Sequence, residues 1–98
     1  MSQYTIFGRG KSGSYFVECL LQKANVDYKF ETVSYEETKK SDFLKVNPLA
    51  RTPVLVTPEG QTIIESVAIF LHLVEKFPVI APEANSFERN LMWQHLAV

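Results

Sequence analysis

The segment ARTPVLVTPEGQTIIES, residues 50–66, decides the fold of this chain. Two short runs of β-branched and aliphatic residues, 54–57 and 61–64, flank a Pro-Glu-Gly turn, and this arrangement predicts an antiparallel hairpin. Pro53 directly precedes the first run, and an acidic residue followed by a serine comes directly after the second. A hairpin needs neither flanking feature, so we expect them to serve another purpose.

Upstream of the hairpin, the chain alternates between strand and helix patterns. Residues 4–7 are β-branched and aromatic and predict a buried first strand. Residues 15–24 predict a helix, with Ser14 as its N-terminal cap. Asn25 is expected to end this helix in a left-handed backbone conformation. Residues 28–33 alternate polar and apolar, so we expect a second strand that is parallel to the first, reached by a right-handed crossover.

Two further helices flank the hairpin. Residues 41–46 predict a short helix that stops before Pro48, because proline disfavours helical geometry in the residue preceding it. Ser66 begins a longer helix with apolar residues at helical spacing. These apolar residues are Val67, Phe70, Leu71, Val74 and Phe77. The predicted order is βαβαββα, an α/β domain over residues 1–80.

Residues 81–98 predict a linker and the first helix of a helical domain. That helix ends without a cap, and its apolar side chains need a partner surface. They are Leu91, Met92, Trp93 and Leu96. We therefore expect the natural protein to continue past residue 98.

Composition excludes several classes of function. The chain has 98 residues, 46% of them hydrophobic and 12% aromatic, which is enough for one packed core. Lys and Arg number 10 and Asp and Glu 11, interspersed, so we expect no nucleic-acid binding. No apolar run approaches the roughly 20 residues that span a bilayer, and no signal-peptide pattern opens the chain. We expect a cytoplasmic protein that does not bind membranes.

Cys19 is the only cysteine, which excludes an internal disulfide, a CxxC motif and a cysteine-based zinc site. We expect no metal. The thiol lies in the mostly apolar segment YFVECLLQKA, so we expect it to be buried and inert. A position in the middle of a predicted helix also argues against a thiol-disulfide oxidoreductase of the glutaredoxin type.

Three other features favour structural roles. The segment GRGKS, residues 8–12, lacks the glycine that a GxxxxGK[ST] phosphate loop needs five residues before Gly10, because Thr5 stands there. Tyr4 lies within the first strand and is predicted to pack there. His72 falls away from the apolar stripe of its helix, so we expect it to be solvated.

The hairpin region resembles a known family, the cytosolic glutathione S-transferases. Residues 47–55, NPLARTPVL, are close to the family pattern NPxGKVPxL, and residues 65–69, ESVAI, match its ESxAI. The resemblance covers residues 3 to about 80, which look like the N-terminal domain of that family. It implies a thioredoxin-like fold with a four-stranded mixed sheet, and residues 86–98 look like the start of the family's helical second domain.

In this family the proline of the motif follows a cis peptide bond. The resemblance thus implies a cis bond between Thr52 and Pro53, although a trans proline that merely starts an edge strand is commoner overall. A sharp turn there would direct the main chain of Val54 at a cleft, where it would form two hydrogen bonds with the cysteinyl unit of glutathione.

The resemblance also assigns the two ends of glutathione. Ser66, at a helix N-terminus, would receive the γ-glutamyl carboxylate, and Glu65 would pair with the ammonium group. The alternative interpretation is structural: Ser66 caps the helix, and Glu65 is an ordinary acidic residue in its first turn. Arg51 and Lys39 are the candidates for the glycyl carboxylate.

The thiol-activating residue of this family lies after the first strand, where a hydroxyl or a cysteine stabilises the thiolate of glutathione. Here the sequence departs from the family, because the usual position falls on Lys11. We take the neighbouring Ser12 as the catalytic hydroxyl, since the glycines around it allow the loop to shift. Lys11 and Ser14 remain alternatives.

The resemblance therefore implies a homodimeric, cytoplasmic glutathione transferase of the detoxifying kind. Glutathione would be its co-substrate and an unidentified electrophile its second substrate. In the family the helical domain supplies most of the electrophile pocket, so we expect residues 1–98 alone to be weakly active or inactive. The alternative is a non-catalytic domain of the same family that serves as a protein-interaction module. Lys11 favours this alternative, and the retained ligand-binding residues argue against it.

Overall fold

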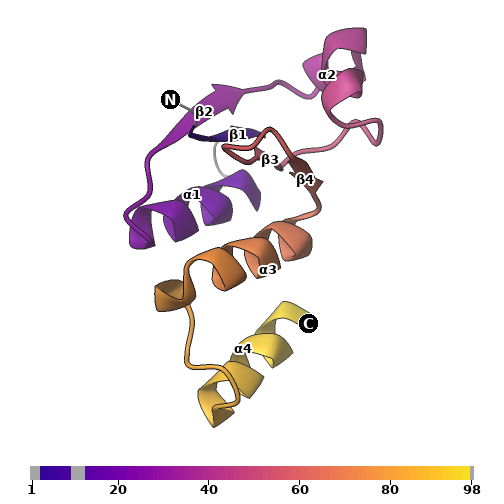
Figure 1. The fold of residues 1–98 in the computed structure, drawn as a ribbon. Helices are drawn as coiled ribbons and strands as arrows, with labels where there is room; N and C mark the ends of the chain where they lie inside the picture. Colours follow the sequence, from indigo (N-terminus) through magenta and orange to yellow (C-terminus); the bar gives the residue numbers. More distant parts are fainter. Residues whose placement is uncertain (1–2, 10–12, 98) are drawn as a thin grey trace.

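A four-stranded mixed sheet forms the centre of the molecule (Figure 1). The computed structural model describes residues 3–9 and 13–97. Its strands are β1 (Tyr4–Gly8), β2 (Tyr28–Thr32), β3 (Val54–Val56) and β4 (Thr62–Ile64), in the order β2-β1-β3-β4. β1 is parallel to β2, whereas β3 is antiparallel to both β1 and β4. The predicted parallel pairing of the first two strands and the predicted hairpin are both confirmed.

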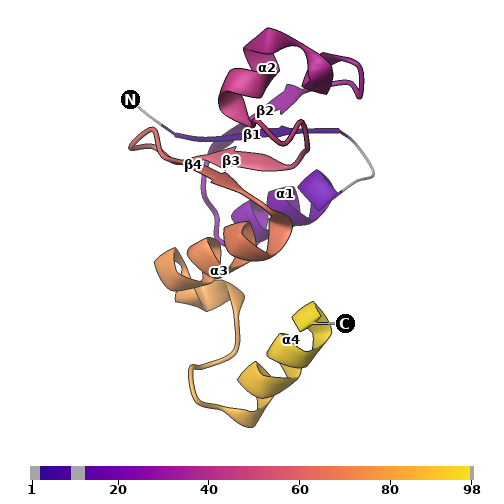
Figure 2. The ribbon, with the colours of Figure 1, turned by 90° about the vertical axis from the view of Figure 1, so that its right-hand side faces the viewer.

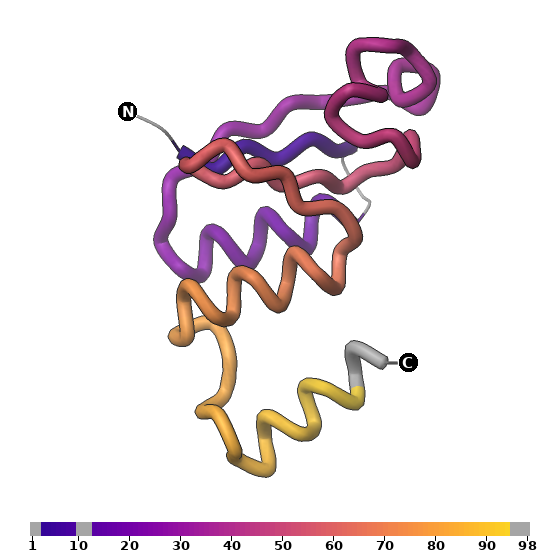
Figure 3. Tube along the Cα trace, turned by 45° about the vertical axis from the view of Figure 1, so that its right-hand side comes forward, coloured from indigo at the N-terminus to yellow at the C-terminus, as the bar shows by residue number. Residues whose placement is uncertain are grey.

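Helices cover both faces of this sheet. They are α1 (Gly13–Lys23), α2 (Ser41–Val46), α3 (Ser66–Lys76) and α4 (Phe87–Ala97), with 3-10 turns η1 (Glu37–Lys39) and η2 (Pro78–Ile80). α1 and α3 lie side by side on one face, and α2 lies on the other (Figure 2). α4 lies beyond α3, on the side away from the sheet (Figure 3). The βαβαββα order and the thioredoxin-like fold are confirmed.

The sheet separates two apolar clusters. The larger joins β1 and β3 to α1 and α3, and Ile6 and Leu55 are fully buried in it. The smaller, on the α2 face, contains Val33, Phe43 and Val54. Val54 and Leu55 are neighbours in β3 and enter different clusters, because successive strand residues point to opposite faces.

The apolar stripe of α3 differs from the predicted one. Ile69, Phe70, Leu73 and Val74 are buried, whereas Val67 is 47% exposed. The helix packs against both the sheet and α1, and this places Ile69 and Leu73 at the centre of its buried face. The prediction for Val67 was wrong.

Two single-residue predictions were also wrong. Cys19 is exposed, because α1 directs its buried residues, such as Val17 and Leu21, to the other side. His72 is half-buried, and its Nε2 atom lies 3.1 Å from the hydroxyl of Tyr4. Tyr4 itself is 5% exposed, which confirms its packing role.

Two features are absent from the part of the chain that the structure describes. None of the helices in residues 3–9 and 13–97 combines the length and hydrophobicity needed to cross a bilayer. Within the same part of the chain, no three His, Cys, Asp or Glu residues are grouped so that they could hold a metal ion.

Candidate functional site

The starts of α1 and α3 meet at the entry to β3. The peptide bond between Thr52 and Pro53 is cis, as the sequence motif implied. A Cβ atom added to Gly13, the first residue of α1, would lie 3.4 Å from Cδ of Pro53. Val54 pairs with Ile64 in β4, and α3 begins two residues later at Ser66. The fold therefore gathers Gly13, Pro53 and Ser66 at one end of the sheet.

Glu65 links β4 to α3 in an unusual backbone conformation. Its φ angle is 74°, in the left-handed region that non-glycine residues disfavour by about 1–2 kcal/mol. Its carbonyl accepts a hydrogen bond from the backbone N–H of Ile69 at 3.0 Å, but its side chain does not cap the helix. Such strain is often found at ligand sites. The carboxylate remains available for another contact.

The helix-cap interpretation of Ser66 was wrong. Ser66 is the first residue of α3, and the N-cap position belongs to Glu65. The side chain of Ser66 is exposed, and its hydroxyl has no hydrogen bond within the described part of the chain. The first turn of α3 therefore presents both a hydroxyl and main-chain N–H groups to a ligand.

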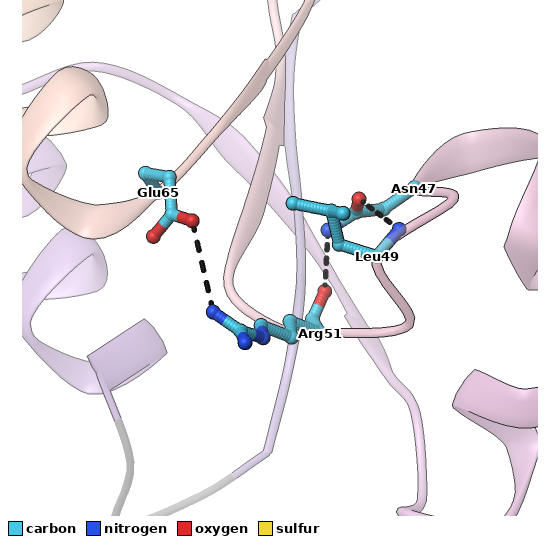
Figure 4. A network of polar contacts seen from close by, with 4 residues as sticks. All are labelled: Asn47, Leu49, Arg51 and Glu65. Carbon is cyan, nitrogen blue, oxygen red and sulfur yellow. Dashed lines mark hydrogen bonds and ion pairs between the residues drawn. The ribbon is translucent and has the colours of Figure 1, made fainter.

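Figure 4 shows the loop that precedes Pro53. Buried Asn47 organises it: the side-chain amide donates to the carbonyl of Arg51 at 2.9 Å, and Oδ1 accepts from the N–H of Leu49 at 2.9 Å. Ala50 has a φ of 56°. Asn47 opens the NPxGKVPxL match, but no role for its side chain was predicted from the sequence.

Arg51 and Glu65 contact each other. The guanidinium nitrogen of Arg51 lies 3.9 Å from Oε1 of Glu65, and the two side chains are 73% and 60% exposed (Figure 4). An exposed pair of this kind contributes less than about 1 kcal/mol, so a charged ligand can separate it at small cost. The structure thus brings together two residues that the sequence analysis assigned to opposite ends of a ligand.

Pro53 and Val54 are covered in this conformation. Val54 is 0% exposed, Pro53 is buried, and Thr52 is half-buried. Because neighbouring protein atoms shield Val54 from solvent, they must move before a ligand can reach its main chain. The predicted strand-like contact at Val54 therefore requires a local rearrangement.

Comparison with known proteins identifies the family. The N-terminal domain of glutathione S-transferases matches residues 2–75. The chain belongs to the glutathione S-transferase family. A probable maleylacetoacetate isomerase of Caenorhabditis elegans is 41% identical over 68 residues, which is 68% of this chain and 31% of that protein. The protein URE2 of Candida glabrata is 37% identical over 82 residues, which is 79% of this chain and 23% of that protein.

Solved glutathione transferases share the fold. A homologue from Sulfitobacter with bound glutathione superposes with a TM-score of 0.89 at 21% identity, over 99% of this chain and 48% of that one. A glutathione transferase from Methylococcus capsulatus gives 0.84 at 29% identity, over 96% of this chain and 49% of that one. The chain spans less than half the length of each of these four proteins.

The loop between β1 and α1 is where this transferase-family domain departs from the family pattern. Ser14 is fully buried, and its hydroxyl accepts from the N–H of Arg9 at 3.0 Å and donates to the carbonyl of Arg9 at 2.6 Å. Gly8 permits this close approach, since an added Cβ would lie 2.1 Å from Cβ of Ser14. The hydroxyl proton of Ser14 is thus already engaged. Lys11 and Ser12 lie outside the described residues.

Lys39 joins a group of side chains separate from Arg51 and Glu65. It lies in η1, and its Nζ atom is 4.8 Å from the centre of the Tyr35 ring. The guanidinium carbon of Arg9 lies 6.0 Å from the same ring. Neither Arg9 nor Tyr35 was predicted from the sequence, because only the parallel pairing of β1 and β2 brings them together.

Proposed function

We propose that this domain binds glutathione and, in the whole protein, activates its thiol for conjugation to an electrophile. The observation that carries the proposal is the convergence of Gly13, Pro53 and Ser66 at one end of the sheet, beside the charged side chains of Arg51 and Glu65. Two helix starts and an extended strand suit a short peptide that is anionic at both ends.

The γ-glutamyl end of glutathione is assigned to the start of α3. Its carboxylate would accept from the hydroxyl and N–H of Ser66, where the helix dipole favours negative charge. Glu65 would exchange its weak contact with Arg51 for the ligand's ammonium group. Arg51 is then released to face a carboxylate, and Lys39 remains a candidate for the glycyl end.

The cysteinyl unit is assigned to the main chain of Val54. In this arrangement the ligand displaces the protein atoms that shield Val54 from solvent. It then forms two hydrogen bonds with the main chain of Val54, as an additional β-strand would. The sulfur would then lie near Gly13 at the N-terminus of α1, the residue that follows Ser12 in the sequence. Thr52 and Pro53 shape the turn that brings these groups together.

Thiol activation needs a modest electrostatic effect. Lowering a thiol pKa from about 8.5 to about 6.5 makes most of it ionised at neutral pH and corresponds to about 2.7 kcal/mol. One hydrogen bond from a serine hydroxyl together with the positive end of a helix dipole is of that order. We propose Ser12 as the donor, since Ser14 already donates to Arg9.

Several wider features remain part of the proposal. We propose a cytoplasmic, detoxifying homodimer, with residues 1–80 as the glutathione-binding domain and residues 81–98 as linker and first helix of a helical domain. Exposed apolar side chains at Leu49, Val67 and Trp93 suit further burial in such an assembly.

Calorimetry and a conjugation assay test the function. Ser66→Ala should weaken glutathione binding about tenfold, because one charge-assisted hydrogen bond is lost while the N–H group remains. In the whole protein, Ser12→Ala should lower kcat while glutathione still binds. Absence of glutathione binding by the unaltered protein would refute the proposal.

A non-catalytic interaction module is the second candidate. The complete burial of Val54 favours it, because a closed site is what a domain without a ligand would keep. Glutathione binding with no conjugation of any electrophile by the whole protein would support this candidate over catalysis.

A further inference from the structure

A cavity of about 450 Å³ opens between β2 and α2, on the face of the sheet opposite α1 and α3 (Figure 2). α1 and α3 have 11 residues each, whereas α2 has 6 and leaves part of its face of the sheet open. A cavity of this size can hold a small organic molecule. None of the described residues that we assign to glutathione lines it, so any ligand bound here would be recognised by other side chains.

Aromatic and aliphatic side chains form one part of the cavity lining. The rings of Phe7 and Phe43 meet edge to face, with their centres 6.2 Å apart. Phe43 and Val33 are buried, whereas Phe7 and Val46 are half-buried. The half-buried side chains leave apolar surface in contact with water, and covering it with another apolar group is favourable. Because aromatic rings pack well against the edges and faces of other rings, this part of the lining suits an aromatic group.

Strand pairing places a carboxylate beside this apolar surface. Glu31 of β2 is opposite Phe7 of β1 in the parallel register, so the two side chains point to the same face of the sheet. The Nζ atom of Lys29, two residues earlier in β2, lies 2.8 Å from Oε1 of Glu31. The structure thus shows this carboxylate in contact with a primary ammonium group. Both side chains of the pair are more than 40% exposed, so the contact contributes little to stability and another ammonium group can replace Lys29.

Two further carboxylates line the α2 side of the cavity. Asp42, in the first turn of α2, is exposed. The carboxylate of Glu37 accepts from the N–H of Ser34 at 3.0 Å, and hydrogen bonds from Ser34 lower the pKa of Glu37, which favours its ionised form. Among the described residues that line the cavity, Lys40 carries the only positive charge. The charge of the lining therefore favours a cation and disfavours an anion.

We propose that this cavity binds a small organic cation in which a primary ammonium group is joined to an aromatic ring. The ring would lie against Phe7 and Phe43. The ammonium group would bind Glu31 in the place of Lys29, and Asp42 would add a second negative charge. The proposal does not depend on glutathione binding, because the two ligands would use different residues and opposite charges.

Calorimetry of phenethylammonium with the whole protein tests the proposal. Two related probes each lack one of its groups: ethylammonium has no ring, and phenylethanol has no charge. Ethylammonium should bind at least about tenfold more weakly, because it buries no aromatic surface. Phenylethanol should also bind more weakly than phenethylammonium. Added salt should weaken binding of phenethylammonium and leave that of phenylethanol unchanged, since salt screens only the charged probe.

Single-charge variants test where the ammonium group binds. Glu31→Gln and Asp42→Asn should each weaken phenethylammonium binding by up to about fivefold, the range for an exposed ion pair, without affecting phenylethanol. Lys29→Gln should tighten binding by a factor of about two to five, because it removes the internal ammonium group that competes for Glu31. Asp27→Asn is the matched control, since this exposed residue precedes β2, does not line the cavity and should leave binding unchanged.

Three results would overturn the proposal. The first is the absence of saturable phenethylammonium binding by the unaltered protein. The second is an affinity that Glu31→Gln and Asp42→Asn leave unchanged or that Lys29→Gln lowers, because Lys29 would then not compete with the ligand. The third is loss of phenethylammonium binding in excess glutathione, which would mean that the two ligands share one site. None of these results concerns glutathione binding itself, so the proposed function is tested separately.

Discussion

Two residues of the candidate site hold left-handed backbone conformations without being glycine. Glu65 has a φ of 74° and Ala50 a φ of 56°. Only one of the two has a proposed ligand contact, because the carboxylate of Glu65 is proposed to bind the ammonium group of glutathione. Ala50 stands where the family pattern has glycine, and nothing in the proposed binding scheme needs its methyl group. These two residues allow backbone strain to be separated from ligand binding.

We predict that Glu65→Gly and Ala50→Gly each raise the free energy of unfolding by about 0.5–1 kcal/mol. Glycine adopts a positive φ without steric cost, although its larger entropy in the unfolded chain offsets part of the gain. Only Glu65→Gly should weaken glutathione binding, because only that change removes a proposed ligand contact. Urea unfolding and calorimetry on the same samples measure both effects. Equal glutathione affinity of the two variants would contradict the role given to Glu65.

At the scale of elements, a half-buried polar contact connects the start of β1 to the middle of α3. The hydroxyl of Tyr4 and Nε2 of His72 lie 3.1 Å apart, and the ring of Phe77 packs edge-on against Tyr4. Burial lowers the pKa of His72, and Lys76 lowers it further, whereas Glu75 and Glu59 act in the opposite direction. Burial and Glu59 raise the pKa of Tyr4. Both shifts favour the neutral forms of the imidazole and the phenol.

We predict that this contact makes stability depend on pH. The pKa of His72 is depressed in the folded state, so the unfolded chain takes up a proton first as the pH falls below about 6.5. The stability that His72 provides is fully present above that pH and is lost as the pH falls toward the lower folded pKa. Denaturant unfolding measured above and below this pH range should show that the free energy of unfolding falls more steeply with decreasing pH in the unaltered protein than in His72→Gln. Parallel curves would contradict the prediction.

At the scale of the whole molecule, an apolar groove opens between α4 and the pair α1 and α3. Its volume is about 570 Å³, and Phe16 and Phe70 stack in it with ring centres 5.5 Å apart. Leu91 and Met92 of α4 line the other side. A groove of this kind provides one wall for an apolar substrate or for further helices, and it encloses neither.

We predict that residues 1–98 on their own bind glutathione weakly and conjugate electrophiles at close to the uncatalysed rate. The proposed glutathione contacts come from this domain, but the apolar groove beside α4 is open and does not enclose an electrophile. Calorimetry and a conjugation assay on the purified 98-residue chain measure the two quantities. Robust conjugation by this chain would contradict the prediction.

Local patterns in the sequence were sufficient for the elements and their order. The helix over residues 41–46 ends where Pro48 requires, and Asn25 has the expected positive φ of 59°. The cis bond at Pro53 followed from a family motif. These features depend on residues within a few positions of one another, so a linear pattern contains the information that determines them.

Tertiary packing alone decided which side chains meet. The sequence determined a thioredoxin-like βαβαββα domain with a motif for glutathione, but it did not indicate that Arg51 faces Glu65 or that Arg9 and Lys39 share the Tyr35 ring. The exposure of Cys19 also depends on which face of α1 meets the sheet. Contacts between distant segments depend on strand register and helix packing, and no short pattern in the chain contains that information.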